Sequence, residues 1–154
     1  MNFTPIFKAY PTHSLIELSL ASKLFITRGV FFFTLSLPLT SLFTSGDDIQ
    51  GIWVLFIGWM GLIIFQFSWF ANPLNLLALL ILSERPVTAL LLSLAAFVVA
   101  SQTLVFSEIP SGASLGKIHI KELGLGFYFW YFSHALFFIG ILVETLKQTQ
   151  KNGD

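Results

Sequence analysis

The sequence predicts an all-α integral membrane protein in which four helices span the bilayer as a bundle. The composition is the first reason: of 154 residues, 55% are hydrophobic and only 10% are charged, and the mean hydropathy is +0.82. Soluble globular domains carry about a quarter charged residues, so this chain lacks the charge to cover a water-exposed surface. The second reason is that apolar runs long enough to cross a hydrocarbon core, ~20 residues each, recur along the chain. We expect one transmembrane domain over residues 1–154, with spans at approximately 24–44, 52–82, 87–106 and 124–146.

Charge and cysteine usage exclude several classes of function. The eight basic and eight acidic residues cancel, which leaves no electrostatic basis for binding nucleic acid. The chain has no cysteine, so thiolate catalysis, disulfide exchange and thiolate metal sites are excluded. The sequence contains no phosphate-binding loop, metal-ligand spacing or catalytic-triad order. We therefore expect a protein that is not an enzyme and that holds no metal or cofactor.

The N-terminal part of the chain is expected to lie at the membrane surface, ahead of the first span. Residues 1–22 contain Lys8 but no long apolar run, so they do not resemble a cleavable signal peptide. From residue 12 onward the mixture of apolar and polar residues favours a short N-terminal interfacial helix. In the first span, Arg28 lies one turn inside the start and is expected to extend to the headgroups. Pro38 is expected to kink the same helix.

The central stretch, residues 51–82, is the feature around which the chain is organised. It contains no ionised side chain and holds three of the four tryptophans. As one straight helix at ~1.5 Å per residue it would extend ~48 Å, more than a bilayer core and a modest tilt accommodate. Pro73 removes a backbone donor, and Asn72 can cap a new helix start. The second span is therefore predicted as a helix kinked at Pro73.

Small side chains recur at helical spacing in the third and fourth spans. In the third span they are separated by four, three, four and three residues, and in the fourth they recur every seven. Such stripes let membrane helices approach closely where no hydrophobic force draws them together. We predict two helix-packing seams, made of Ala89, Ser93, Ala96, Ala100 and Thr103 in the third span and Gly126, Ser133 and Gly140 in the fourth.

The segment between the third and fourth spans is polar and contains a short alternating pattern. Residues 117–121 alternate polar and apolar side chains, which is typical of a β-strand. Tyr128, Trp130 and Tyr131 follow near the start of the fourth span, where an aromatic belt is expected.

The distribution of basic residues predicts how the chain is threaded. Basic residues in short loops favour the cytoplasmic side of a membrane. With four spans, both termini and the turn at 83–86 share one side, which carries Lys8, Lys23, Arg28, Arg85, Lys147 and Lys151. The other side carries only Lys117 and Lys121, besides the acidic turn at 47–48. We therefore expect both termini in the cytoplasm.

Five polar residues within or near the spans are the candidate functional residues: Gln66, Asn72, Asn75, His134 and Arg28. Gln66 and His134 lie near the expected midplane, where they could hydrogen-bond to each other across helices. His134 alone could instead relay a proton, and we favour the structural packing role. Asn72, Asn75 and Arg28 share a similar depth and could bind an anionic headgroup. The same residues have a structural explanation, in which Asn72 caps the helix at the Pro73 kink and Arg28 extends to the membrane surface. We favour this structural interpretation.

Two motifs resemble small uncharacterised bacterial inner-membrane proteins. The first is Trp-Phe-Ala-Asn-Pro-Leu at 69–74, near a span end, and the second is Gly-Phe-Tyr-Phe-Trp at 126–130 with Ser133, which opens the last span. The resemblance extends over residues 58–140. It implies four spans and a bacterial plasma membrane, and it implies no particular activity.

These observations favour a multi-pass protein of the bacterial inner membrane that acts through helix contacts. Our preferred hypothesis is a non-enzymatic accessory, immunity-type or complex-forming protein, because the two seams offer surfaces for close helix contact. Its partners would be the lipid bilayer and either a larger membrane protein or further copies of the chain. The alternative is a small oligomeric transporter or channel, suggested by Gln66, Asn72 and His134 inside the spans. A subunit of a lipid-modifying enzyme is a third hypothesis.

Overall fold

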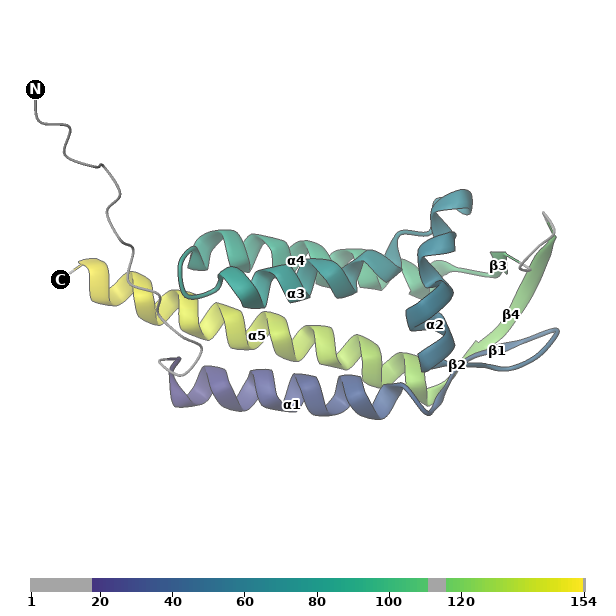
Figure 1. Cartoon of the computed structure of the whole chain (residues 1–154), viewed down its shortest axis with the longest axis horizontal. Coiled ribbons are helices and arrows are strands. Elements are labelled where there is room, and N and C mark those ends of the chain that lie inside the picture. Colours follow the sequence, from purple (N-terminus) through teal and green to yellow (C-terminus); the bar gives the residue numbers. More distant parts are fainter. Residues whose placement is uncertain (1–17, 111–115, 154) are drawn as a thin grey trace, which may run out of the picture.

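The computed structural model describes residues 18–110 and 116–153, and it is mostly helical, as the sequence predicted. Four helices lie side by side along one axis: α1 (Leu20–Ser36), α3 (Ala71–Ile81), α4 (Pro86–Ser101) and α5 (Leu125–Gly153) (Figure 1). Helix α5 lies in the middle of the array, with α1 against one side and α4 against the other, while α3 packs mainly on α4.

The contact between α1 and α5 is close because small residues face it from both helices. A Cβ atom added at Gly29 would lie 2.7 Å from the ring of Phe137, and one at Gly140 would lie 2.9 Å from Ile26. The Ser22 hydroxyl donates to the carbonyl of Gly140 at 2.8 Å. The Ser19 amide, just before α1, donates to the Glu144 carboxylate at 2.8 Å. The first and last helices are thus joined by packing and by hydrogen bonds.

A curled four-stranded sheet lies at one end of the helices, and the all-α prediction missed it (Figure 1). Its strands are β1 (Thr40–Thr44), β2 (Ile49–Gln50), β3 (Glu108–Pro110) and β4 (Lys117–Leu123). All neighbours are antiparallel, in the order β2-β1-β4-β3. The strand predicted from the alternation at 117–121 is confirmed as part of β4.

The first predicted span, 24–44, is helical only in its first part. Helix α1 begins at Leu20, where the Ser19 hydroxyl accepts the amide of Ser22, and it ends at Ser36. Pro38 ends the helix instead of kinking it, because its ring has no N–H and collides with the carbonyl four residues earlier. The chain then enters β1. The predicted interfacial helix falls mostly outside the described residues, and its last residues form the first turn of α1.

The second predicted span is not one helix kinked at Pro73. It consists of α2 (Gly51–Ile57), the 3-10 helices η2 (Gly58–Ile64) and η3 (Ser68–Phe70), and then α3. The break lies at Phe65, whose φ of 59° is in the left-handed region. Pro73 lies in the first turn of α3, where a missing N–H removes no helical hydrogen bond, so the proline is accommodated without a kink.

The backbone at this break is fastened by Gln102, the first residue of the 3-10 helix η4 (Gln102–Val105). The Gln102 side-chain amide donates to the carbonyl of Phe65 at 2.9 Å, and its oxygen accepts the amide of Phe67 at 2.7 Å. The Gln66 side chain donates to the backbone carbonyl of Glu108 in β3. Non-helical backbone is costly away from water unless its polar groups find partners. These three side-chain bonds supply partners, and they tie the break to α4 and to the sheet.

Candidate functional site

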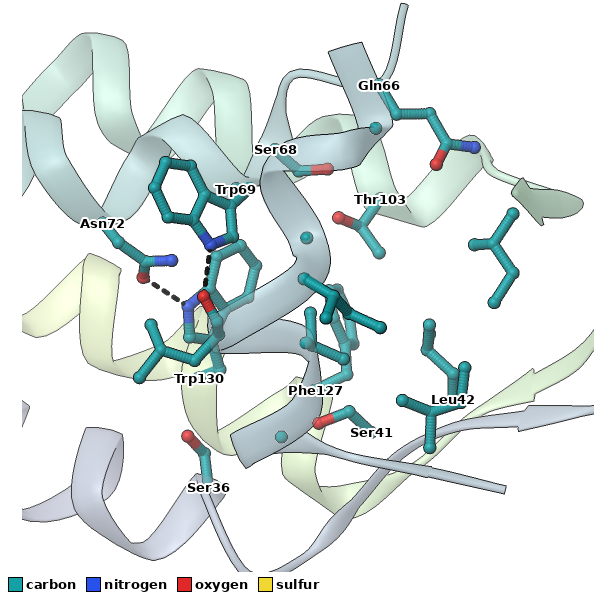
Figure 2. A pocket seen from close by; sticks show the side chains of 18 of the residues that line it. Ser36, Ser41, Leu42, Gln66, Ser68, Trp69, Asn72, Thr103, Phe127 and Trp130 are labelled. Carbon is teal, nitrogen blue, oxygen red and sulfur yellow. Dashed lines mark hydrogen bonds between the residues drawn. The ribbon is translucent and has the colours of Figure 1, made fainter. Parts of the chain in front are cut away.

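A cavity of about 170 Å³ lies where the sheet meets the ends of the helices (Figure 2). Helix α2 and η2 form one wall, and the sheet forms another, mainly through β1 and β4. The ends of α1, α3 and α5 and residues of η3 and of η4 (Gln102–Val105) contribute the rest of the lining. Most lining residues are apolar, and none of those that the structure describes there has an ionisable side chain. The lining consists of Phe33, Ser36, Leu37, Ser41, Leu42, Ile49, Gly51, Val54, Leu55, Ile57, Gly58, Met60, Gly61, Gln66, Ser68, Trp69, Asn72, Thr103, Phe106, Ile109, Ile120, Phe127 and Trp130.

Close backbone contacts hold the α2–η2 wall in place. A Cβ atom at Gly51 would collide with the backbone carbonyl of Ser36, at the end of α1. One at Gly61 would lie 2.6 Å from the backbone carbonyl of Gln66. Because these neighbours are backbone atoms, they cannot move aside as a flexible side chain would. The cavity wall therefore depends on glycine at both positions.

Two tryptophans on the cavity lining are fixed by hydrogen bonds (Figure 2). The Trp69 indole N–H donates to the carbonyl of Leu55 at 2.7 Å, which links η3 to α2. The Trp130 indole N–H donates to the side-chain oxygen of Asn72 at 2.8 Å, which links α5 to α3. Asn72 does not cap a helix as predicted, because α3 has no side-chain cap and Asn72 lies inside its first turn. Both indole rings are thus held in one orientation beside the cavity.

Four lining side chains have polar groups left over for a ligand. The hydroxyls of Ser41, Ser68 and Thr103 make no hydrogen bond within the part of the chain that the structure describes. The same is true of the Asn72 amide nitrogen, since only its oxygen is engaged, by Trp130. Each of these groups can donate to an oxygen atom in the cavity.

A second cluster of polar residues is buried between α3, α4 and α5. The Ser93 hydroxyl donates to the side-chain oxygen of Asn75 at 2.7 Å, and the Asn75 amide nitrogen bonds to His134 Nδ1. All three residues are at most 2% exposed. Because Asn75 donates to Nδ1, the neutral imidazole carries its proton on Nε2, and this atom has no hydrogen-bond partner among the described residues. The cluster braces three helices against one another.

The structure brings some of the predicted polar residues together and separates others. Asn75 and His134 are paired, whereas Gln66 bonds to β3 and not to His134. Arg28 is exposed on α1, while Asn72 and Asn75 engage Trp130 and His134 of α5. The side-chain bonds of Asn72 and Asn75 to Trp130 and His134 thus lead to α5 and not to Arg28, which gives no support to the alternative of a headgroup pocket.

The residues of both predicted seams are buried. Ala89, Ser93, Ala96 and Ala100 have no exposed surface, Thr103 is nearly buried, and they face α3 and α5. In α5, Gly140 contacts α1, and a Cβ atom at Gly126 would lie 2.6 Å from both the carbonyl of Leu39 and the hydroxyl of Ser41. Ser133 turns its hydroxyl to the carbonyl of Trp130 at 2.6 Å.

Sequence reasoning missed Gln102 as the fastening of the break, Trp130 as a partner of Asn72, and Gly29 as the close contact with α5. Of these residues, only Trp130 stands out in the sequence, because it is the one tryptophan outside the central stretch at 51–82. Groups of three or more potential metal ligands are absent from the described residues. Comparisons of the chain with protein-family models, with curated proteins and with solved structures found no match.

Proposed function

We propose that the chain is a multi-pass protein of the bacterial inner membrane, with α1, α3, α4 and α5 crossing the bilayer. The observation that carries this proposal is the distribution of side chains between inside and outside. Small and polar residues such as Ala89, Ser93 and Asn75 make up much of the interior, beside a few large apolar ones such as Leu82 and Ile141. Many other large apolar side chains point outward. Leu91 of α4, for example, is 61% exposed, while Ala96 of the same helix is fully buried. Soluble proteins bury their large apolar side chains, so this distribution favours lipid as the surrounding solvent.

Helix lengths support a membrane crossing for α4 and α5. Two segments of the described chain, Pro86–Val105 and Leu125–Lys151, are long and apolar enough to cross a membrane by length and composition. Helix α1 has 17 residues and α3 has 11, which correspond to ~26 Å and ~17 Å at the helical rise. Both are shorter than a hydrocarbon core of ~30 Å, so their crossing rests on their position in the array beside α4 and α5. The shorter α3 is preceded by η2, which exposes Trp59, and by Phe65, which is exposed at the break between η2 and η3. Exposed aromatic side chains of this kind suit the boundary between lipid and water. We infer that α2, η2 and η3 lie at that boundary.

The charges at the two ends of the array favour cytoplasmic termini. The Thr145 hydroxyl donates to the carbonyl of Pro86 at 3.1 Å, so the turn before α4 lies beside the C-terminal part of α5. That end carries the basic residues Lys23, Arg85, Lys147 and Lys151, whereas Lys8 lies outside the described residues. The sheet end carries Lys117 and Lys121 together with Asp47, Asp48, Glu108 and Glu122. The excess of basic residues indicates the cytoplasmic side.

One ion pair on the sheet is consistent with contact with water. The Lys117 ammonium lies 2.8 Å from the Glu108 carboxylate, and both side chains are exposed. The hydrogen bond from Lys117 and its charge lower the pKa of Glu108 below its usual value.

Reporter fusions test the threading. A periplasmic reporter enzyme fused after Asp48 is expected to be active, and the same enzyme fused after Arg85 or Lys151 is expected to be inactive. A cytoplasmic fluorescent reporter at the same three positions should give the opposite pattern and controls for expression. Periplasmic activity at Lys151 would require an odd number of spans and would contradict the proposal.

For the activity, we propose a non-enzymatic accessory protein that assembles with a larger membrane protein. The polar residues of the interior favour a packed scaffold rather than a path for ions, because Ser93 and His134 both bond to Asn75. The outward apolar faces of α3 and α4 offer surfaces for a partner helix. The transporter or channel hypothesis instead requires polar groups that face a water-filled path.

Extraction in a mild detergent followed by native mass spectrometry distinguishes the two hypotheses. A stoichiometric complex with another membrane protein is the expected result. A chain that is recovered alone, and that conducts protons or ions in liposomes until His134→Leu abolishes the flux, would overturn the accessory proposal in favour of a channel.

A further inference from the structure

We propose that the cavity beneath the sheet is a binding site for a small, uncharged molecule with a six-membered ring and a ring oxygen substituent, such as a phenol. The size of the cavity is the first argument. Its volume is about 170 Å³, and an apolar protein cavity of ~150 Å³ is known to hold one benzene molecule. A single ring with one or two substituents therefore matches the space.

The lining determines the charge and shape of the ligand. A charged ligand would lose its hydration and find no opposite charge, because the described lining has no ionisable side chain. Trp69, Phe127 and Trp130 line the cavity with aromatic surface, which packs favourably against another ring. The indoles of Trp69 and Trp130 are already fixed by hydrogen bonds. Binding therefore requires little ordering of the protein.

The unused polar groups explain why the ligand should carry oxygen. Ser68 and Thr103 lie together on one side of the lining, Asn72 lies beside Trp130, and Ser41 lies across from them on β1 (Figure 2). All four can donate a hydrogen bond, and none of these groups has an acceptor within the described residues. A purely apolar ligand would leave them without partners, at a cost in affinity. A hydroxyl or carbonyl oxygen on the ring provides the missing acceptor.

Equilibrium binding to the full chain in lipid nanodiscs tests the inference, with empty nanodiscs subtracted as the partition control. The probes are p-cresol, toluene, which has the same ring without the oxygen, and benzoate, which is charged. We expect saturable binding of one p-cresol per chain, binding of toluene about tenfold weaker, and no saturable binding of benzoate. Equal binding of toluene and p-cresol would overturn the assignment of an oxygen-bearing ligand, and absence of saturable p-cresol binding would overturn the site itself.

Three variants locate the binding. Thr103→Val keeps the shape of the side chain but removes its hydroxyl, and it is expected to weaken p-cresol binding about three- to tenfold. Thr34→Val is the matched control, because the Thr34 hydroxyl bonds only to Val30 on the exposed side of α1. Val54→Phe fills the cavity from α2 and is expected to abolish binding while the chain still melts cooperatively. If Val54→Phe is folded and binds p-cresol as the unmodified chain does, the site lies elsewhere. This outcome is independent of the threading and partner experiments.

Discussion

Replacing Asn75 with leucine is expected to lower the free energy of unfolding by about 3 kcal/mol, since several buried polar atoms lose their partners together. Asn75 accepts the Ser93 hydroxyl and bonds to His134 Nδ1. All three residues are nearly inaccessible to solvent, so neither partner can turn to water instead. Unfolding in mixed detergent micelles, followed by tryptophan fluorescence, measures the loss.

A combined variant serves as the control for that prediction. Ser93→Ala, Asn75→Leu and His134→Leu together remove every member of the cluster, and the triple variant is expected to recover much of the stability lost in Asn75→Leu alone. The reason is that replacing all partners by apolar groups leaves none of them unsatisfied. If Asn75→Leu alone unfolds within about 0.5 kcal/mol of the unmodified chain, the cluster does not brace the helices.

Replacing Ala96 with leucine is expected to destabilise the protein by about 2–3 kcal/mol, because the larger side chain forces closely packed helices apart. Ala96 is fully buried beside Ala71 and Ala100, with Trp130 of α5 packed against the same cluster. Leu91→Ala, on the exposed face of the same helix, is the matched control, and its effect should stay within about 0.5 kcal/mol. Thermal melts in detergent compare the two variants. Equal melting temperatures would mean that the small-residue face of α4 is not a tight contact.

The sequence was most informative about α4 and α5, where periodic small residues are a local property of each helix. The spacing of Ala89, Ser93, Ala96 and Ala100 identifies one face without knowledge of the partner. The sheet was missed because its pairing is not local. Strand β1 contains Leu42 and Phe43 and directly continues an apolar run, so it reads as the end of a span. Leu42 of β1 pairs with Leu123 of β4, which lies far along the chain.

The candidate site was predicted only in part, for a related reason. Hydropathy identifies polar residues inside apolar runs, such as Asn75 and His134, but it does not show which residue each one meets. The break was placed at Pro73 because proline is the residue that most often interrupts a helix. At Phe65 the interruption depends on Gln102, a residue that a local pattern cannot connect to it. The cavity exists only because the sheet, α2 and the helix ends converge, so no single stretch of sequence encodes it.

The contact between α1 and α5 has a consequence for the biosynthesis of the chain. The groups that meet Ser19 and Ser22 are Glu144 and the carbonyl of Gly140, which lie 125 and 118 residues later in the sequence, so α1 is synthesised well before them. Strand β1 likewise pairs with β4, which precedes α5. Until α5 has been synthesised, α1 therefore lacks its main partner. A chain truncated before α5 would leave Ser19 and Ser22 without these hydrogen bonds and would expose the face of α1 that α5 covers.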